Sequence, residues 1–184
     1  CNLNIREAQK ELESWVLNPN QLTVAEQALE EVRAALLNVG ATAIGHEAYE
    51  ICRVLAGVPR VPDDMGQENV PLESEVLYET IDWDKGCYIG QEVIAMMHYR
   101  GRPNRHLTGV RGSGDEPLVG RALLSETGKQ VGQVTSSVMS PTLGTPLGLA
   151  VIKRKHATPG TTLALDGGGT VDVVALPVGA EAQE

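Results

Sequence analysis

The first hundred residues carry apolar positions at helical spacing. Apolar side chains that recur every three to four residues form one face of an amphipathic helix. Capping residues, glycine and proline mark where such segments start and stop. The pattern predicts four helices: residues 4–16 with a cap at Asn4, a second that opens at the capping box Thr23–Glu26 and ends at Gly40, residues 46–55, and a fourth from about Gly90 to Gly101.

A different pattern begins after Pro103. Short runs of alternating apolar and polar residues follow one another, separated by glycine-rich turns. Such runs favour a small antiparallel barrel or sandwich. We predict an α+β chain, with a helical or mixed region at 1–103, a β-barrel domain at 104–178 and a flexible tail at 179–184. The expected strands are residues 107–110, 131–138, 147–152, 161–165 and 170–176.

Residues 60–84 are rich in proline and acidic side chains and predict a long connecting loop. A structureless loop of that length is unusual unless it has a function. We interpret Asp63, Asp64 and Glu68 as solvated loop charges rather than metal ligands, and we predict no metal site. Asp166–Gly169 is interpreted as a hairpin turn, because a phosphate loop needs a lysine and a following helix.

The composition limits the classes of function. The 184-residue chain is 42% hydrophobic and carries a net charge of −9, with no phenylalanine and only 3% aromatic residues. An acidic chain with few stacking residues is not typical of direct nucleic-acid binding. No apolar run is long enough to span a membrane, and no signal peptide is evident. We therefore expect a cytoplasmic protein with neither nucleic acid nor a membrane as partner.

Three cysteines, at positions 1, 52 and 87, give an odd count without paired spacing. This pattern argues against a disulfide scaffold and against a classical zinc site. Cys52 shares the apolar face of its predicted helix with Ala48, Ile51 and Leu55. We predict that Cys52 lies in the core.

The segment Lys85–Glu92 is the strongest candidate for chemistry. Its sequence, Lys-Gly-Cys-Tyr-Ile-Gly-Gln-Glu, places Cys87 near Lys85 and just before a predicted helix. Cations and helix N-termini favour the reactive thiolate form of a cysteine. We predict a functional thiol, the alternative being a small buried hydrophobic residue. His98 is a weaker candidate, either as a base that activates Cys87 or as a surface histidine.

The same segment resembles the Lys-Gly-Cys-Tyr-x-Gly-Gln-Glu motif of the YgfZ family. These folate-binding proteins are related to the aminomethyltransferase (T-protein, GcvT) of the glycine cleavage system, which usually has aspartate or another residue where Cys87 stands. Met96 and Leu55 depart from the family pattern, which usually has an arginine and a glutamate there. Supporting similarities lie at residues 49–60, 68–73, 131–136 and 140–144.

The resemblance implies a GcvT-like aminomethyltransferase fold whose helical region binds tetrahydrofolate. In the family, a large N-terminal region precedes the part seen here. Because this chain begins at Cys1, we expect a fragment that does not carry a complete folate pocket alone. The resemblance gives catalytic roles to Cys87 and Lys85, and cofactor-binding roles to Gly86, Tyr88, Gly90, Gln91, Glu92 and Arg53.

The function implied by the resemblance is that of a folate-binding accessory protein. It would support assembly or repair of iron–sulfur clusters, and thereby tRNA modification, with iron–sulfur enzymes or their assembly proteins as partners. Two alternatives stay open: a tetrahydrofolate-dependent aminomethyltransferase, and a non-catalytic protein-interaction module. Cys87 separates the first two readings, because the transferase does not need a thiol.

Overall fold

The chain divides into two compact units, Cys1–Gly45 and His46–Glu184, and the computed structural model describes residues 19–178. In the first unit, helix α2 spans Pro19–Asn38. Just after the helix, Gly40 has a left-handed φ of 90°, and the amide of Ala41 donates a hydrogen bond to the carbonyl of Leu36. Because α2 already begins at Pro19, the prediction of a helix start at Thr23 is wrong. The helix expected at residues 4–16 lies outside the described residues.

In the second unit, helix α3 (His46–Ala56) packs one side against the barrel described below. Its buried residues are Arg53 and Val54. Gly57 ends the helix with a φ of 74°, and a Cβ at this position would lie only 2.9 Å from Leu176 Cδ1. Glycine is therefore required both by the backbone and by the space available. Val54 belongs to a core cluster that joins helix and barrel, together with Met65, Leu107, Leu147 and Leu149.

Cys52 is exposed, so the prediction that it lies in the core is wrong. The side of α3 that faces the protein interior is the one that carries Arg53 and Val54, and Cys52 lies beside it. The spacing of apolar residues along the helix had instead predicted that the neighbouring face, which carries Cys52, is buried. The contact that fixes α3 is partly ionic, and hydrophobic spacing cannot reveal such a contact.

Residues 60–84 contain two short helices, which corrects the expectation of a continuous loop. They are η1 (Pro71–Glu73) and α4 (Glu75–Tyr78). Ser74 lies between them, and its buried hydroxyl accepts a hydrogen bond from the amide of Leu77 at 3.5 Å. Helix α5 (Gln91–Arg100) follows within the predicted range, after Gly90 with its φ of 90°.

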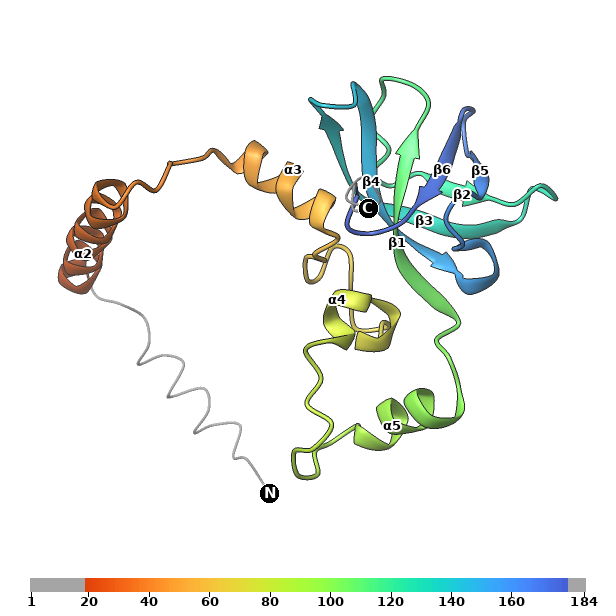
Figure 1. Cartoon of the computed structure of the whole chain (residues 1–184), viewed down its shortest axis with the longest axis horizontal. Coiled ribbons are helices and arrows are strands. Elements are labelled where there is room, and N and C mark those ends of the chain that lie inside the picture. Colours follow the sequence, from red (N-terminus) through yellow and green to blue (C-terminus); the bar gives the residue numbers. More distant parts are fainter. Residues whose placement is uncertain (1–18, 179–184) are drawn as a thin grey trace. The chain divides into compact units, whose positions relative to one another are not determined.

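Six antiparallel strands close into a barrel, as Figure 1 shows. The order around the barrel is β1-β4-β3-β2-β5-β6. The short helix η2 (Arg154–His156) follows β4. The strands are β1 (Arg105–Gly112), β2 (Ala122–Leu124), β3 (Gln130–Ser140), β4 (Thr145–Lys153), β5 (Thr162–Leu165) and β6 (Thr170–Val174).

The barrel interior is filled by aliphatic side chains, as expected for a chain without phenylalanine. The fully buried residues include Val110, Leu123, Val134, Ile152 and Val173. The predicted α+β class with an antiparallel barrel is confirmed. Five strands lie where alternation predicted them, whereas β2 was missed because it has only three residues. Within residues 19–178, no helix combines the length and apolar character needed to cross a bilayer.

Candidate functional site

The segment that carries Cys87 is an exposed connection without helix or strand, which runs into α5. The side chain of Asp82 shapes its first part, because Oδ1 accepts hydrogen bonds from the amides of Asp84 and Lys85 at 3.0 and 3.2 Å. Its second part is closed by a reciprocal pair: the Tyr88 amide donates to Gln91 Oε1, and the Gln91 amide donates to the Tyr88 carbonyl, both at 3.3 Å. Local hydrogen bonds thus hold both sides of Cys87.

The thiol of Cys87 is exposed to solvent, so the alternative of a buried hydrophobic residue does not describe it. Among residues 19–178, no side chain forms a hydrogen bond with its sulfur. Nearby, the ammonium group of Lys85 lies 4.6 Å from the centre of the Tyr88 ring, a cation–π contact. Glu92 is exposed in the first turn of α5. The segment therefore presents a thiol, an amine, an aromatic ring and a carboxylate to solvent.

His98 belongs to an aromatic cluster beside α5. Its ring stacks on Trp83 with centroids 4.0 Å apart, and its Nδ1 lies 2.9 Å from the hydroxyl of Tyr78. These contacts give His98 a role in holding the segment before Cys87 against α5. No contact between His98 and Cys87 is found in the described part of the chain, so the idea of an activating base has no geometric support there.

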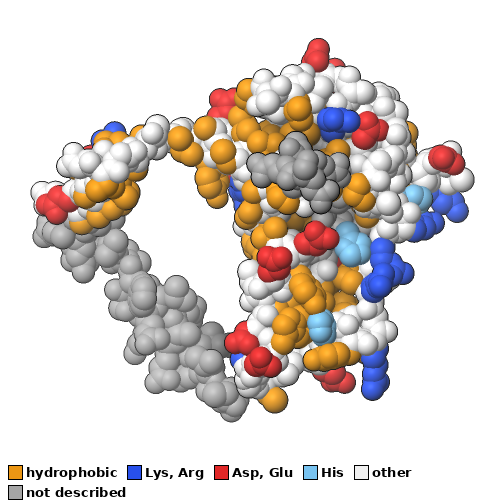
Figure 2. Space-filling view, in the orientation of Figure 1, with side chains coloured by type: hydrophobic (Ala, Val, Ile, Leu, Met, Phe, Trp, Pro, Cys, Tyr) orange, Lys and Arg blue, Asp and Glu red, His pale blue; other side chains and the backbone are white. Residues whose placement is uncertain are grey.

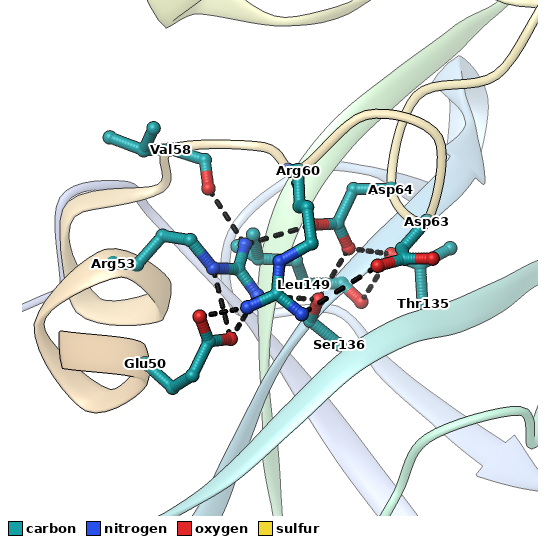
Figure 3. A network of polar contacts seen from close by, with 9 residues as sticks. All are labelled: Glu50, Arg53, Val58, Arg60, Asp63, Asp64, Thr135, Ser136 and Leu149. Carbon is teal, nitrogen blue, oxygen red and sulfur yellow. Dashed lines mark hydrogen bonds and ion pairs between the residues drawn. The ribbon is translucent and has the colours of Figure 1, made fainter. Parts of the chain in front are cut away.

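Arg53, the remaining predicted site residue, lies in a buried polar network shown in Figure 3. The side chain is only 6% exposed. Its Nη1 donates to Asp64 Oδ2 and to the carbonyl of Val58, both at 2.8 Å, and its Nη2 donates to Ser136 Oγ at 2.8 Å. Nε and Nη2 also reach Glu50 Oε2 at 3.1 and 2.9 Å. All of these partners lie outside the Cys87 segment.

Asp64 is the second centre of the network. It is 2% exposed, which shows that its interpretation as a solvated loop charge is wrong. Besides Arg53, it accepts hydrogen bonds from the hydroxyls of Thr135 and Ser136 at 2.5 and 2.7 Å, and from the amide of Arg60 at 2.9 Å. A buried carboxylate is stable only with such partners. Asp64 thereby fastens the connection after α3 to strand β3.

Glu50 completes the network at its outer edge. The hydrogen bond from Arg53, together with the charges of Arg53 and Arg60, lowers the pKa of the Glu50 carboxyl below its usual value and outweighs the opposing effect of burial. Arg60 also forms an ion pair with Glu50. The network therefore pairs two arginines with three carboxylates, those of Glu50, Asp63 and Asp64, and α3 is joined to the barrel partly by these charges.

A second, smaller network forms within the stretch Glu68–Glu73. The carboxylate of Glu73 is buried and accepts hydrogen bonds from Asn69 Nδ2 at 2.6 Å and from Arg105 Nε at 3.2 Å. Arg105 Nη2 also donates to the carbonyl of Glu68 at 2.7 Å. Arg105 opens strand β1, so this stretch is tied to the barrel as well. Its polar residues serve the fold.

No group of three or more residues suited to hold a metal ion occurs in the described ranges. The predicted residues from Lys85 to Glu92 come together as one exposed surface, whereas Arg53 points into the buried network. The prediction that Arg53 binds a cofactor stays a prediction, and its donors are already occupied by protein acceptors. Sequence reasoning missed the burial of Asp64, and neither periodicity nor composition signals it.

Comparison with known proteins agrees with this architecture. Residues 105–178 match the model of the glycine cleavage T-protein C-terminal barrel domain. An aminomethyltransferase of Saccharopolyspora erythraea is 35% identical over 138 residues, which cover 72% of this chain and 37% of that protein. A putative chloroplastic transferase of Arabidopsis thaliana is 34% identical over 131 residues, which cover 71% of this chain and 29% of that protein.

A solved structure extends the similarity to the fold. The crystal structure of the glycine cleavage system aminomethyltransferase T from Bartonella henselae superimposes with a TM-score of 0.70 at 20% identity, covering 83% of this chain and 44% of that one. This chain thus spans less than half the length of the relatives that it matches. The chain is thus similar to aminomethyltransferases over most of its length, and its barrel at residues 105–178 matches the glycine cleavage T-protein C-terminal barrel domain.

Proposed function

We propose that the protein to which this chain belongs is a cytoplasmic folate-binding accessory protein that supports assembly or repair of iron–sulfur clusters, with Cys87 as its functional thiol. The observation that carries the proposal is the exposure of Cys87 in a connection shaped by local hydrogen bonds. A cysteine kept for packing is usually buried. The resemblance of Lys85–Glu92 to the YgfZ motif supports the choice of client, namely iron–sulfur enzymes or their assembly proteins.

The residues present do not form a complete folate site. Tyr88, Gln91 and Glu92 offer an aromatic face, an amide and a carboxylate, which suit a heterocyclic ring with hydrogen-bonding edges. However, Arg53, to which the resemblance gives a cofactor-binding role, is buried and bonded to Glu50 and Asp64. We therefore propose that folate binding requires parts of the fold beyond residues 19–178, and we assign no chemical step to folate here.

Aminomethyl transfer is a second candidate function. The observation that favours it is the similarity to proteins named aminomethyltransferase, which extends across 72–88% of this chain and beyond the barrel. In that case, the segment around Cys87 shapes a ligand site and the sulfur itself is dispensable. The two candidates therefore differ in what they require of a single atom.

The proposal is tested in cells that lack the protein. Wild-type protein should restore the activity of an iron–sulfur enzyme, and the Cys87→Ala variant should fail to restore it. Full rescue by Cys87→Ala would contradict the proposal that the thiol is functional. Because the side chain is exposed, the variant should fold normally, with a change in unfolding free energy within about 0.5 kcal/mol.

The transferase candidate has a separate readout. Purified full-length protein would be assayed for transfer of a one-carbon unit to tetrahydrofolate. Turnover by the purified protein that survives Cys87→Ala would favour the transferase. So would iron–sulfur enzymes that remain active in cells lacking the protein. Folate binding without turnover would favour the accessory protein.

A further inference from the structure

A cleft of about 640 Å³ opens where α3, α4 and the barrel meet. Its volume lies within the range of small-molecule sites. No residue of the Cys87 segment lines it, so it is separate from the site described above. Its walls come from the end of α3, the segment 74–79, the start of β1, the connection 154–159 between β4 and β5, and residues 175–177.

The inner wall of the cleft is apolar, and its buried hydroxyls are already bonded. Leu107 and Leu176 contribute aliphatic surface. Thr108 Oγ1 donates to the carbonyl of Val174 at 3.2 Å, and Ser74 Oγ accepts from the Leu77 amide. These hydroxyls serve the protein itself. The inner wall therefore offers a surface for an aliphatic group rather than for a polar one.

The rim of the cleft carries charges of both signs. Glu75 and Glu79 lie one turn apart, at the start of α4 and just after its end, whereas Arg154 comes from η2. Figure 2 shows acidic side chains over α4, with a histidine and basic side chains beside them. In the described part of the chain, none of these three residues forms an ion pair within 4.0 Å.

Among the described residues of the second unit, Arg154 shares this lack of pairing with the exposed Arg100 and Arg102, whereas the other arginines are paired. The arginines that form ion pairs with carboxylates are Arg53, Arg60, Arg105, Arg111 and Arg121. Arg154 and the two glutamates line the same cleft without forming an ion pair with one another in the described part of the chain. Their charges remain available to a ligand that reaches both sides.

His106 lies on the cleft wall as well, and it is half-buried. Burial and the nearby charge of Arg154 lower the pKa of its imidazole, against weaker opposing effects of Glu75 and Glu73. The ring is therefore neutral at pH 7, with one donor and one acceptor nitrogen. Among residues 19–178, no hydrogen bond to this ring is found, so both nitrogens can serve a ligand.

We propose that this cleft binds a small aliphatic zwitterion, with its ammonium group at Glu75 and Glu79, its carboxylate at Arg154 and its chain against Leu107 and Leu176. A ligand with only one sign of charge would meet like charge on the opposite rim. A neutral apolar ligand would desolvate the rim charges without replacing their hydration. A molecule with both charges and an aliphatic middle avoids both costs.

The test uses 6-aminohexanoate as the probe and the whole 184-residue chain. Amide resonances of Val76, Leu107 and Ala157 should shift on titration, with a Kd on the order of millimolar, as expected for so small a ligand. Hexylamine and hexanoate, which each keep one charge, should bind at least about tenfold more weakly, because each loses its charge-assisted bonds at one end. Equal affinity for the three probes, or no shift at these residues, would overturn the proposal.

Variants assign the two ends. Arg154→Gln should weaken 6-aminohexanoate about tenfold or more without weakening hexylamine, for which a like charge on the opposite rim is lost. Glu75→Gln combined with Glu79→Gln should weaken the probe without weakening hexanoate, for the same reason. Arg102→Gln, an exposed arginine outside the cleft, is the matched control and should bind normally. Unchanged affinity of the probe in Arg154→Gln would contradict the proposed orientation.

Discussion

Two polar regions of the second unit differ in what surrounds their reactive groups. In the network of Arg53 and Asp64, the two side chains are 6% and 2% exposed. Both Nη atoms of Arg53 and both carboxylate oxygens of Asp64 form hydrogen bonds with protein partners. In the segment Lys85–Glu92, Cys87 is exposed and forms no hydrogen bond within the described residues. The presence of a residue such as Arg53 is explained by its contribution to the stability of the fold. A residue such as Cys87 has no such explanation, which is the reason to look for its function in chemistry.

The difference follows from the cost of burying charge. An isolated buried ion loses its hydration, so a stable fold places an opposite charge and hydrogen-bond donors around it. Asp64 has four such donors, from Arg53, Arg60, Thr135 and Ser136. An exposed group has water as its partner and needs no protein neighbour. Polar residues with the same chemistry can therefore belong to the fold or to a site, and burial distinguishes the two.

The comparison predicts its largest effect at Arg53. Arg53→Ala leaves Asp64 buried without its cation and should lower the unfolding free energy by about 3–5 kcal/mol. Urea denaturation of the two proteins measures the difference. Arg102→Ala, which removes an exposed arginine, should change it by no more than about 0.5 kcal/mol. A loss at Arg53 as small as that at Arg102 would show that the network does not hold α3.

The next effect is expected at Gly148, where a side chain would have little room between the barrel strands. A Cβ on Gly148 would lie 2.6 Å from the carbonyl oxygen of Ser136 and 3.0 Å from Val134 Cγ1. Gly148→Ala should therefore destabilise the protein by about 1–3 kcal/mol, measured by the same urea titration. Gly114→Ala is the matched control, because a Cβ there meets no atom within 4 Å. Equal stability of the two variants would contradict the packing of β3 on β4.

A smaller effect is expected in the pH dependence of stability. The pKa of Glu50 is lowered in the folded protein, chiefly by the hydrogen bond from Arg53. A lowered folded-state pKa means that the unfolded chain binds the proton more tightly, so stability is present above the ordinary value of 4.5 and is lost as the pH falls below it. Glu50→Gln should flatten this acid limb in thermal unfolding scans. An acid limb of unchanged steepness would argue against the ion pairs of Glu50.

Much of the fold was predictable because local patterns decide it. Gly57 and Gly90 mark helix ends in the sequence, and both have positive φ angles. Alternation predicted every strand except β2, whose three residues are too short to show a period. The errors at Cys52 and Asp64 share one cause. The face of α3 that contacts the barrel is fixed by an ion pair between residues eleven positions apart, and such a partnership has no sequence period.

The environment of the candidate site residues was not predictable from the motif. The motif singled out Lys85–Glu92, and the structure shows these residues together on one surface. It also grouped Arg53 with them, although the partners of Arg53 are Glu50, Asp64 and Ser136. A motif records which residues accompany one another in a sequence. It does not record which of them face solvent.

We propose that the sulfur of Cys87, rather than the place of this residue in the fold, carries the function. The most direct test of this proposal is the iron–sulfur enzyme activity restored in deficient cells by Cys87→Ser, relative to that restored by Cys52→Ser. Both cysteines are exposed, and both substitutions should leave the unfolding free energy within about 0.5 kcal/mol of the wild type. The account predicts full rescue by Cys52→Ser and none by Cys87→Ser. Equal rescue by the two variants would contradict it.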